Sequence, residues 1–169
     1  RDLHYPVRRQ RQMCIRDRNW TDAKSKGLKY GAYHFFTFCK SGTEQANNFI
    51  ASVPIDPASL PPVIDLEYGG NCKLTKSKEE ILSELLLFDK RLHDHYNKKP
   101  ILYIAQEFYK DFLLNQFMNS PLWIRAIYHE PSLENNRKWI FWQYANRGLV
   151  DGVETYVDLN VFKGTKQDL

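Results

Sequence analysis

The chain has 169 residues, of which 43% are hydrophobic and 14% aromatic, so it is long and apolar enough for one globular domain with a real core. This composition excludes a disordered chain, and no apolar run approaches the roughly 20 residues of a membrane-spanning helix. The net charge is +4, but six of the 24 basic and two of the 20 acidic residues lie in residues 1–18, so the remainder is balanced. We therefore expect neither nucleic acid nor a membrane as a partner.

The basic run at residues 1–18, RDLHYPVRRQRQMCIRDR, has three interpretations. It is a basic arm for an anionic partner, an ordinary solvated terminus, or a segment that is not natural coding sequence. We favour the third, because VRRQRQMCIRDR resembles the translated adapter read-through found at the ends of metagenomic assemblies. We therefore expect residues 1–18 to be non-native or disordered and residues 19–169 to form a partial catalytic domain.

The first predicted elements alternate between helix and strand. Residues 19–29 have the pattern of a helix end, with Gly27 as its stop, and the aromatic-rich segment 30–38 favours a strand. Residues 41–53 form an amphipathic pattern for which we expect Thr43 as the N-cap. The apolar run at 61–67, bounded by proline and glycine turns, predicts a short buried strand.

The second half of the chain continues this alternation with shorter spacings. The longest helix is predicted at 75–97, where Ile81, Leu85, Phe88 and Leu92 repeat at helical spacing. The remaining segments are, in chain order, a strand at 99–105, a short helix at 107–117, and strands at 121–128, 138–145 and 155–162. Strands that alternate with helices predict an α/β fold with parallel pairing. The shorter late spacings predict a β/α barrel whose second half is only partly covered by helices.

Two carboxylates, Asp65 and Glu67, end the 61–67 strand with one leucine between them. Successive strand side chains alternate faces, so the pair shares one face, and like charges at that distance are costly to ionise together. Folding alone does not require this arrangement. In a β/α barrel the chemistry lies at the carboxyl ends of the strands, where Asp158 of the last strand is also expected.

The cysteines allow two interpretations. Cys14 falls in the basic run, which leaves Cys39 and Cys72, each a few residues past a predicted strand. If those strands are neighbours, the thiols lie at one edge of the sheet and can form a disulfide, which would favour an exported protein. Two free thiols are the alternative.

Six segments occur in the order and spacing of a known family: GAYHFF, LPPVIDLE, KPILYI, PLWIRAIY, WIFWQYANRG and VDLNVFKG. Together they resemble glycoside hydrolase family 25, the Chalaropsis-type lysozymes, over residues 19–165. The resemblance implies a flattened, incomplete TIM-like β/α barrel that cleaves the β-1,4 bond between N-acetylmuramic acid and N-acetylglucosamine. The family's first strand, which ends in a further catalytic Asp, has no counterpart here, so we expect the chain to lack one or two initial β/α units.

The resemblance assigns roles to the acidic residues. It makes Glu67 the proton donor, Asp65 the partner carboxylate and Asp158 a further catalytic-centre residue, and it favours net retention. Because the apolar strand and the mutual repulsion raise one pKa of the pair, we expect the raised pKa at Glu67. The family requires no cofactor or metal, and we expect a monomer that acts on peptidoglycan outside the cell or in the envelope.

Sugars stack on aromatic side chains, and five aromatic residues in or beside the strands are candidates for substrate binding, although each could equally be a core residue: Tyr33, Tyr103, Trp123, Tyr128 and Trp142. Because Trp142 precedes Gln143 on one strand, at most one of the two faces the cleft. The sequence also allows two other functions. One is a catalytically dead, truncated remnant that at most binds glycan, and the other is a metal-dependent phosphodiesterase, which the lack of a phosphate-binding glycine loop disfavours.

Overall fold

The computed structural model describes residues 17–169, which divide into two compact units. The first consists of residues 17–31 and 56–60, and the second of residues 32–55 and 61–169. In the first unit, residues 17–25 are helical, and Lys24 Nζ and Tyr30 Oη both donate to Asp56 Oδ2, at 2.6 and 2.7 Å. Residues 1–16, most of the run expected to be non-native or disordered, lie outside the described residues.

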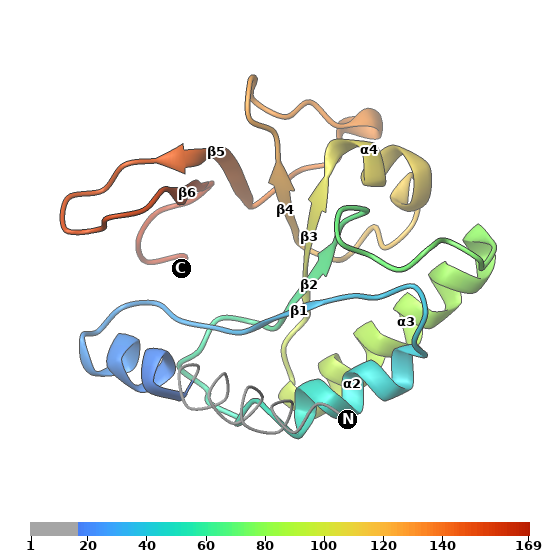
Figure 1. The fold of residues 1–169 in the computed structure, drawn as a ribbon, viewed down its shortest axis with the longest axis horizontal. Coiled ribbons are helices and arrows are strands. Elements are labelled where there is room, and N and C mark those ends of the chain that lie inside the picture. Colours follow the sequence, from blue (N-terminus) through green and yellow to red (C-terminus); the bar gives the residue numbers. More distant parts are fainter. Residues whose placement is uncertain (1–16) are drawn as a thin grey trace, which may run out of the picture. The chain divides into compact units, whose positions relative to one another are not determined.

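A six-stranded sheet forms the centre of the second unit (Figure 1). Its strands follow one another in chain order: β1 (Tyr33–Phe35), β2 (Val63–Leu66), β3 (Ile101–Ala105), β4 (Leu122–Arg125), β5 (Phe141–Gly148) and β6 (Val157–Phe162). The four pairings from β1 to β5 are parallel, as predicted, and the sheet curls as part of a barrel. The last pairing is antiparallel, because the short β5–β6 connection forms a hairpin and holds no crossover helix.

Helices α2 (Gly42–Ile50) and α3 (Lys78–Tyr96) begin where a serine side chain caps them. The other helical segments are α4 (Gln106–Phe108), a π-helical turn at Tyr109–Leu113 and a 3₁₀ turn at Glu134–Asn136. The N-cap of α2 is Ser41, whose side chain accepts from the Glu44 N–H, and not Thr43 as predicted. Ser77 and Glu80 form a capping box at the start of α3.

The main core lies between the sheet and the helices α2 and α3, which pack on each other. The predicted α3 stripe is confirmed: Ile81, Leu85, Phe88 and Leu92 are all buried. On β2, Ile64 and Leu66 are fully buried in this core. Strand alternation therefore turns the intervening carboxyl of Asp65 to the opposite face, away from the helices.

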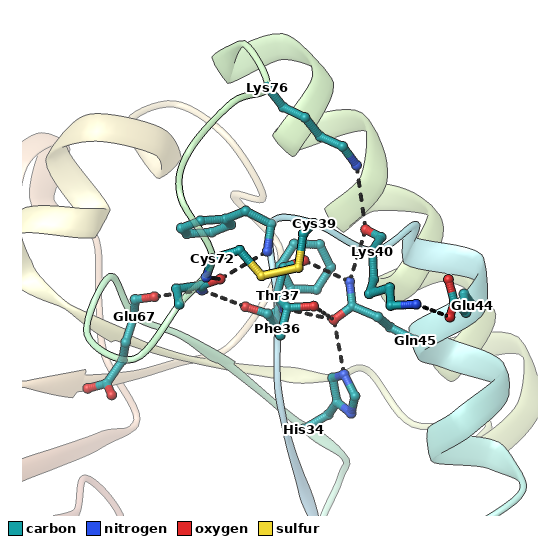
Figure 2. Close-up of a disulfide and its surroundings, with 12 residues drawn as sticks. His34, Phe36, Thr37, Cys39, Lys40, Glu44, Gln45, Glu67, Cys72 and Lys76 are labelled. Carbon is teal, nitrogen blue, oxygen red and sulfur yellow. Dashed lines mark hydrogen bonds and ion pairs between the residues drawn. A yellow bond between two sulfur atoms is a disulfide. The ribbon is translucent and has the colours of Figure 1, made fainter. Parts of the chain in front are cut away.

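Gln45 of α2 anchors the end of β1 to the helix layer (Figure 2). Its Oε1 accepts from the Thr37 N–H at 2.8 Å and contacts His34 Nε2 at 3.1 Å, while its Nε2 donates to Thr37 O at 3.0 Å. The His34 ring lies 5.1 Å from that of Phe88, so His34 faces the helices. Its burial lowers the pKa of the imidazole, which favours the neutral ring.

Gly42, the first residue of α2, is required for the close approach of α2 and α3. A Cβ there would overlap the backbone carbonyl of Glu84, which cannot move as a flexible side chain can. We expect Gly42→Ala to lower the free energy of unfolding by about 1–3 kcal/mol, measured by urea denaturation. Gly69→Ala is the matched control, because a Cβ at Gly69 meets no atom within 4 Å. A Gly42→Ala variant as stable as this control would contradict the packing described.

Candidate active site

A cleft of about 320 Å³ lies on the face of the sheet opposite α2 and α3. All six strands, together with the residue directly after β2, contribute side chains to its lining: Tyr33, Val63, Asp65, Glu67, Tyr103, Trp123, Gln143, Asp158 and Asn160. Asp65, Tyr103 and Trp123 are register partners on three adjacent strands, so residues distant in sequence meet on one face of the sheet.

Asp65 and Glu67 both line the cleft, as the strand alternation predicted. Asp65 lies within β2, paired with Phe35 of β1 on one side and Tyr103 of β3 on the other, whereas Glu67 follows the end of the strand. The Asp65 Oδ1 atom is fully buried and has no hydrogen-bond partner among residues 17–169. It is therefore a buried acceptor that either a proton or a bound ligand could satisfy.

Burial, and secondarily the charge of Glu67, raises the pKa of Asp65 to about 7. We expected the raised pKa of the pair at Glu67, but it is the pKa of Asp65 that the structure raises. The reason is position: Asp65 lies between two neighbouring strands, where burial penalises its charged form.

This shift predicts a pH-dependent effect of Asp65→Asn on stability. The pKa of Asp65 is about 7 in the folded chain and has an ordinary value of 3.8, so between these values the folded state holds the extra proton. The free energy of unfolding therefore falls as pH rises from about 4 to 7, and Asp65→Asn removes this loss. We expect the variant to gain stability over the wild type at pH 8 relative to pH 4 in denaturant titrations. An equal difference at both pH values would contradict the buried position of Asp65.

The wall of the cleft beside the carboxylates is aromatic and polar. The Tyr103 hydroxyl donates to Gln143 Oε1 at 2.6 Å, and Trp123 Nε1 donates to Asn160 Oδ1 at 2.9 Å. The rings of Tyr103 and Trp123 meet edge to face, with centroids 5.5 Å apart. Burial, followed by the charges of the acidic pair, raises the pKa of Tyr103, so its hydroxyl remains a proton donor to Gln143.

The structure brings six of the eight predicted catalytic and substrate-binding residues to this cleft: Tyr33, Asp65, Glu67, Tyr103, Trp123 and Asp158. The other two, Tyr128 and Trp142, are not among its lining residues. Tyr128 follows the end of β4 and is 90% exposed. Trp142 packs against the core, and its Nε1 donates to Ala126 O, so the residue of its strand that faces the cleft is Gln143.

Sequence reasoning missed Asn160 as a residue of the cleft. Asn160 stands two residues after Asp158 on β6, so strand alternation alone could have placed both on one face. Val63 precedes Asp65 by two residues on β2 and follows the same rule. Within residues 17–169 there is no group of three or more His, Cys, Asp or Glu side chains arranged to hold a metal ion. No helix in that part of the chain is long and apolar enough to span a membrane.

The fold and the cleft define a class of protein: an α/β part-barrel with carboxylates and aromatic side chains on one face of its sheet. The profile of "Glycosyl hydrolases family 25" matches residues 11–153, and the chain belongs to this family.

The relatives include both solved structures and curated sequences. A family 25 glycosyl hydrolase from Bacillus anthracis is 42% identical, with a TM-score of 0.84 over 90% of this chain and 72% of that one. A bacterial lysozyme from Streptomyces coelicolor is 26% identical, with a TM-score of 0.78 over 90% of this chain and 76% of that one. The protein YegX from Escherichia coli is 34% identical over 152 residues, which are 90% of this chain. The match spans 54% of YegX, about half the length of that relative.

Proposed function

We propose that this protein is a peptidoglycan hydrolase that cleaves the β-1,4 bond between N-acetylmuramic acid and N-acetylglucosamine. The observation that carries the proposal is the cleft of a family 25 member in which Asp65 and Glu67 share one face of the sheet. Hydrolysis of a glycosidic bond needs two such carboxyl groups, one to protonate the leaving oxygen and one to stabilise, attack or activate water. The similarity to a bacterial lysozyme gives further support.

In the proposed reaction Glu67 is the general acid. It follows the end of β2, so its side chain extends beyond the sheet into the cleft, where a glycosidic oxygen can reach it. Glu67 gives its proton to that oxygen as the bond to the sugar carbon breaks, and water finally supplies a hydroxyl to the carbon and a proton to the enzyme.

Asp65 is the proposed partner carboxyl. Its buried Oδ1 has no partner among residues 17–169, so it is available to orient the substrate's acetamido group or, once ionised, to stabilise positive charge. Asp158 approaches from β6 on the same face and adds negative charge to the cleft. The developing oxocarbenium charge favours the ionised form of both.

The aromatic residues of the cleft are the proposed sugar-binding platform. Tyr33 is 69% exposed on β1, and Trp123 is held by Asn160 on the opposite wall, so the acidic pair lies between two aromatic surfaces. A glycan strand crossing the sheet could stack on both. We further propose that the protein acts as a monomer on cell-wall glycan, outside the cell or in the envelope. The structure joins Cys39 and Cys72 in a disulfide, which would be maintained there.

The test is digestion of purified, insoluble peptidoglycan by the full chain. We expect turbidity to fall and new reducing ends to accumulate, and mass spectrometry of borohydride-reduced products should find muramitol at those ends. Reduced glucosamine ends would indicate the other glycosidic bond and would overturn the bond assignment. Stable binding to peptidoglycan in a pull-down, without any new reducing ends, would favour the alternative function of a non-catalytic glycan-binding protein.

A further inference from the structure

The side-chain amide of Asn71, in the loop after β2, forms four hydrogen bonds. Its Nδ2 donates to Phe36 O and to Glu67 O, both at 2.9 Å. Its Oδ1 accepts from the N–H groups of Phe38 and Cys72, at 3.0 and 2.8 Å. Both donor hydrogens and both acceptor positions of the amide are therefore used. We infer that Asn71 is a positioning residue, which holds Glu67 at the cleft by replacing it in the hydrogen-bond ladder of the sheet.

The register of β1 and β2 shows which bonds Asn71 replaces. The Val63 N–H donates to Ala32 O, and Asp65 O accepts from the Phe36 N–H. In a parallel ladder the next residue on the same face, Glu67, would donate its N–H to Phe36 O and accept from the Phe38 N–H. The Phe36 carbonyl and the Phe38 N–H, in the segment directly after β1, are instead bonded to Nδ2 and Oδ1 of Asn71.

The amide thus stands in for a peptide group at the point where β2 ends. Because the Asn71 amide bonds the Phe36 carbonyl and the Phe38 N–H, Glu67 does not pair directly with that segment. The second Nδ2 hydrogen of Asn71 then fixes the Glu67 carbonyl. Figure 2 shows the result: the carbonyl of Glu67 faces the hydrogen-bonded network, while its carboxylate points away from the disulfide. The backbone of Glu67 is thus fixed by hydrogen bonds, while its carboxylate extends away from them. This arrangement suits a proton donor that must contact a substrate.

The Cys39–Cys72 disulfide secures the same junction. Cys72 follows Asn71, and Cys39 follows Phe38, so the bridge joins the two segments one residue beyond the amide's hydrogen bonds. The Tyr68 ring packs on Phe108, and its hydroxyl donates to Asp111 Oδ2 at 2.6 Å. The loop that carries Asn71 is therefore held at both ends, which keeps the amide in place.

The experiment compares Asn71→Asp with a destabilising control, and it rests on the proposed hydrolase function. The substitution is isosteric but turns Nδ2 into an oxygen that faces the carbonyls of Phe36 and Glu67. We expect kcat for glycan cleavage to fall by about 10–100-fold, with KM changed by less than about threefold. Tyr96→Phe removes the hydrogen bond from its hydroxyl to Val53 O at the C-terminal end of α3, far in sequence from the junction, and should lower the melting temperature while leaving kcat within about twofold. If both variants lose kcat in proportion to their loss of melting temperature, the positioning role is wrong.

A second measurement does not depend on activity. In Asn71→Ala the amide hydrogen of Phe38 should exchange with solvent about tenfold faster or more than in the wild type, because its acceptor is gone. The Leu102 amide, which donates to Pro121 O, is the internal control and should be unchanged. Unchanged exchange at Phe38 would overturn the inference. A wild-type chain that cleaves no glycan would contradict the proposed function, and the exchange at Phe38 would still decide whether Asn71 replaces Glu67 in the ladder.

Discussion

Replacing Glu67 by Gln should lower kcat for peptidoglycan cleavage by about a thousandfold, with little change in KM. An amide of the same size keeps the contacts of the side chain, but it cannot give a proton to the leaving oxygen. The removal of a general acid costs roughly 10²–10⁴-fold in rate. The initial rate of reducing-end release, at several substrate concentrations, provides both constants.

The matched control is Glu154→Gln, which removes the same charge from an exposed residue in the β5–β6 turn. It should leave kcat unchanged, so any effect of total charge on binding to the anionic wall is separated from catalysis. If Glu67→Gln keeps the wild-type kcat, Glu67 is not the proton donor.

The second large effect concerns stability. The Cys39–Cys72 bridge closes a loop with a sequence separation of 33 residues, which the chain-entropy relation converts to about 3–4 kcal/mol of unfolding free energy. We expect the double variant Cys39→Ser, Cys72→Ser to lose about that much in urea denaturation at 25 °C. Because a domain of this size has only about 5–15 kcal/mol in total, the melting temperature should fall clearly as well.

Reduction provides the control for this variant. Under dithiothreitol the wild type should approach the stability of the double serine variant, while the variant itself should not change. If the two proteins have the same stability under oxidising conditions, then the bridge either does not form or does not restrain the unfolded chain.

The parts of the fold that follow from the spacing of neighbouring residues were predictable from the sequence. The buried stripe of α3 follows from the spacing of Ile81 and Leu85, and the shared face of Asp65 and Glu67 follows from strand alternation. The antiparallel β6 was not predicted, because its direction depends on the length of the turn before it and not on its own residues.

The site was predictable in composition but not in its electrostatics. The sequence indicates a carboxyl pair, yet which member has the raised pKa depends on the burial of Asp65 between β1 and β3. The role of Asn71 was likewise hidden, since its amide bonds to Phe36 and Phe38, more than 30 residues earlier in the chain. Contacts of this kind become visible only when the strand register is known.

The central claim is that Glu67 protonates the leaving oxygen, and the leaving group provides its most direct test. We would measure kcat/KM of the wild type, Glu67→Gln and Asp65→Asn on two glycosides of the N-acetylglucosaminyl-N-acetylmuramic acid disaccharide, one with a dinitrophenyl and one with a sugar leaving group. A dinitrophenolate needs no proton to depart, so Glu67→Gln should recover most of the wild-type rate on the aryl substrate and remain inactive on the sugar substrate. Asp65→Asn should be slow on both. Recovery in Asp65→Asn but not in Glu67→Gln would contradict the account and assign the proton to Asp65.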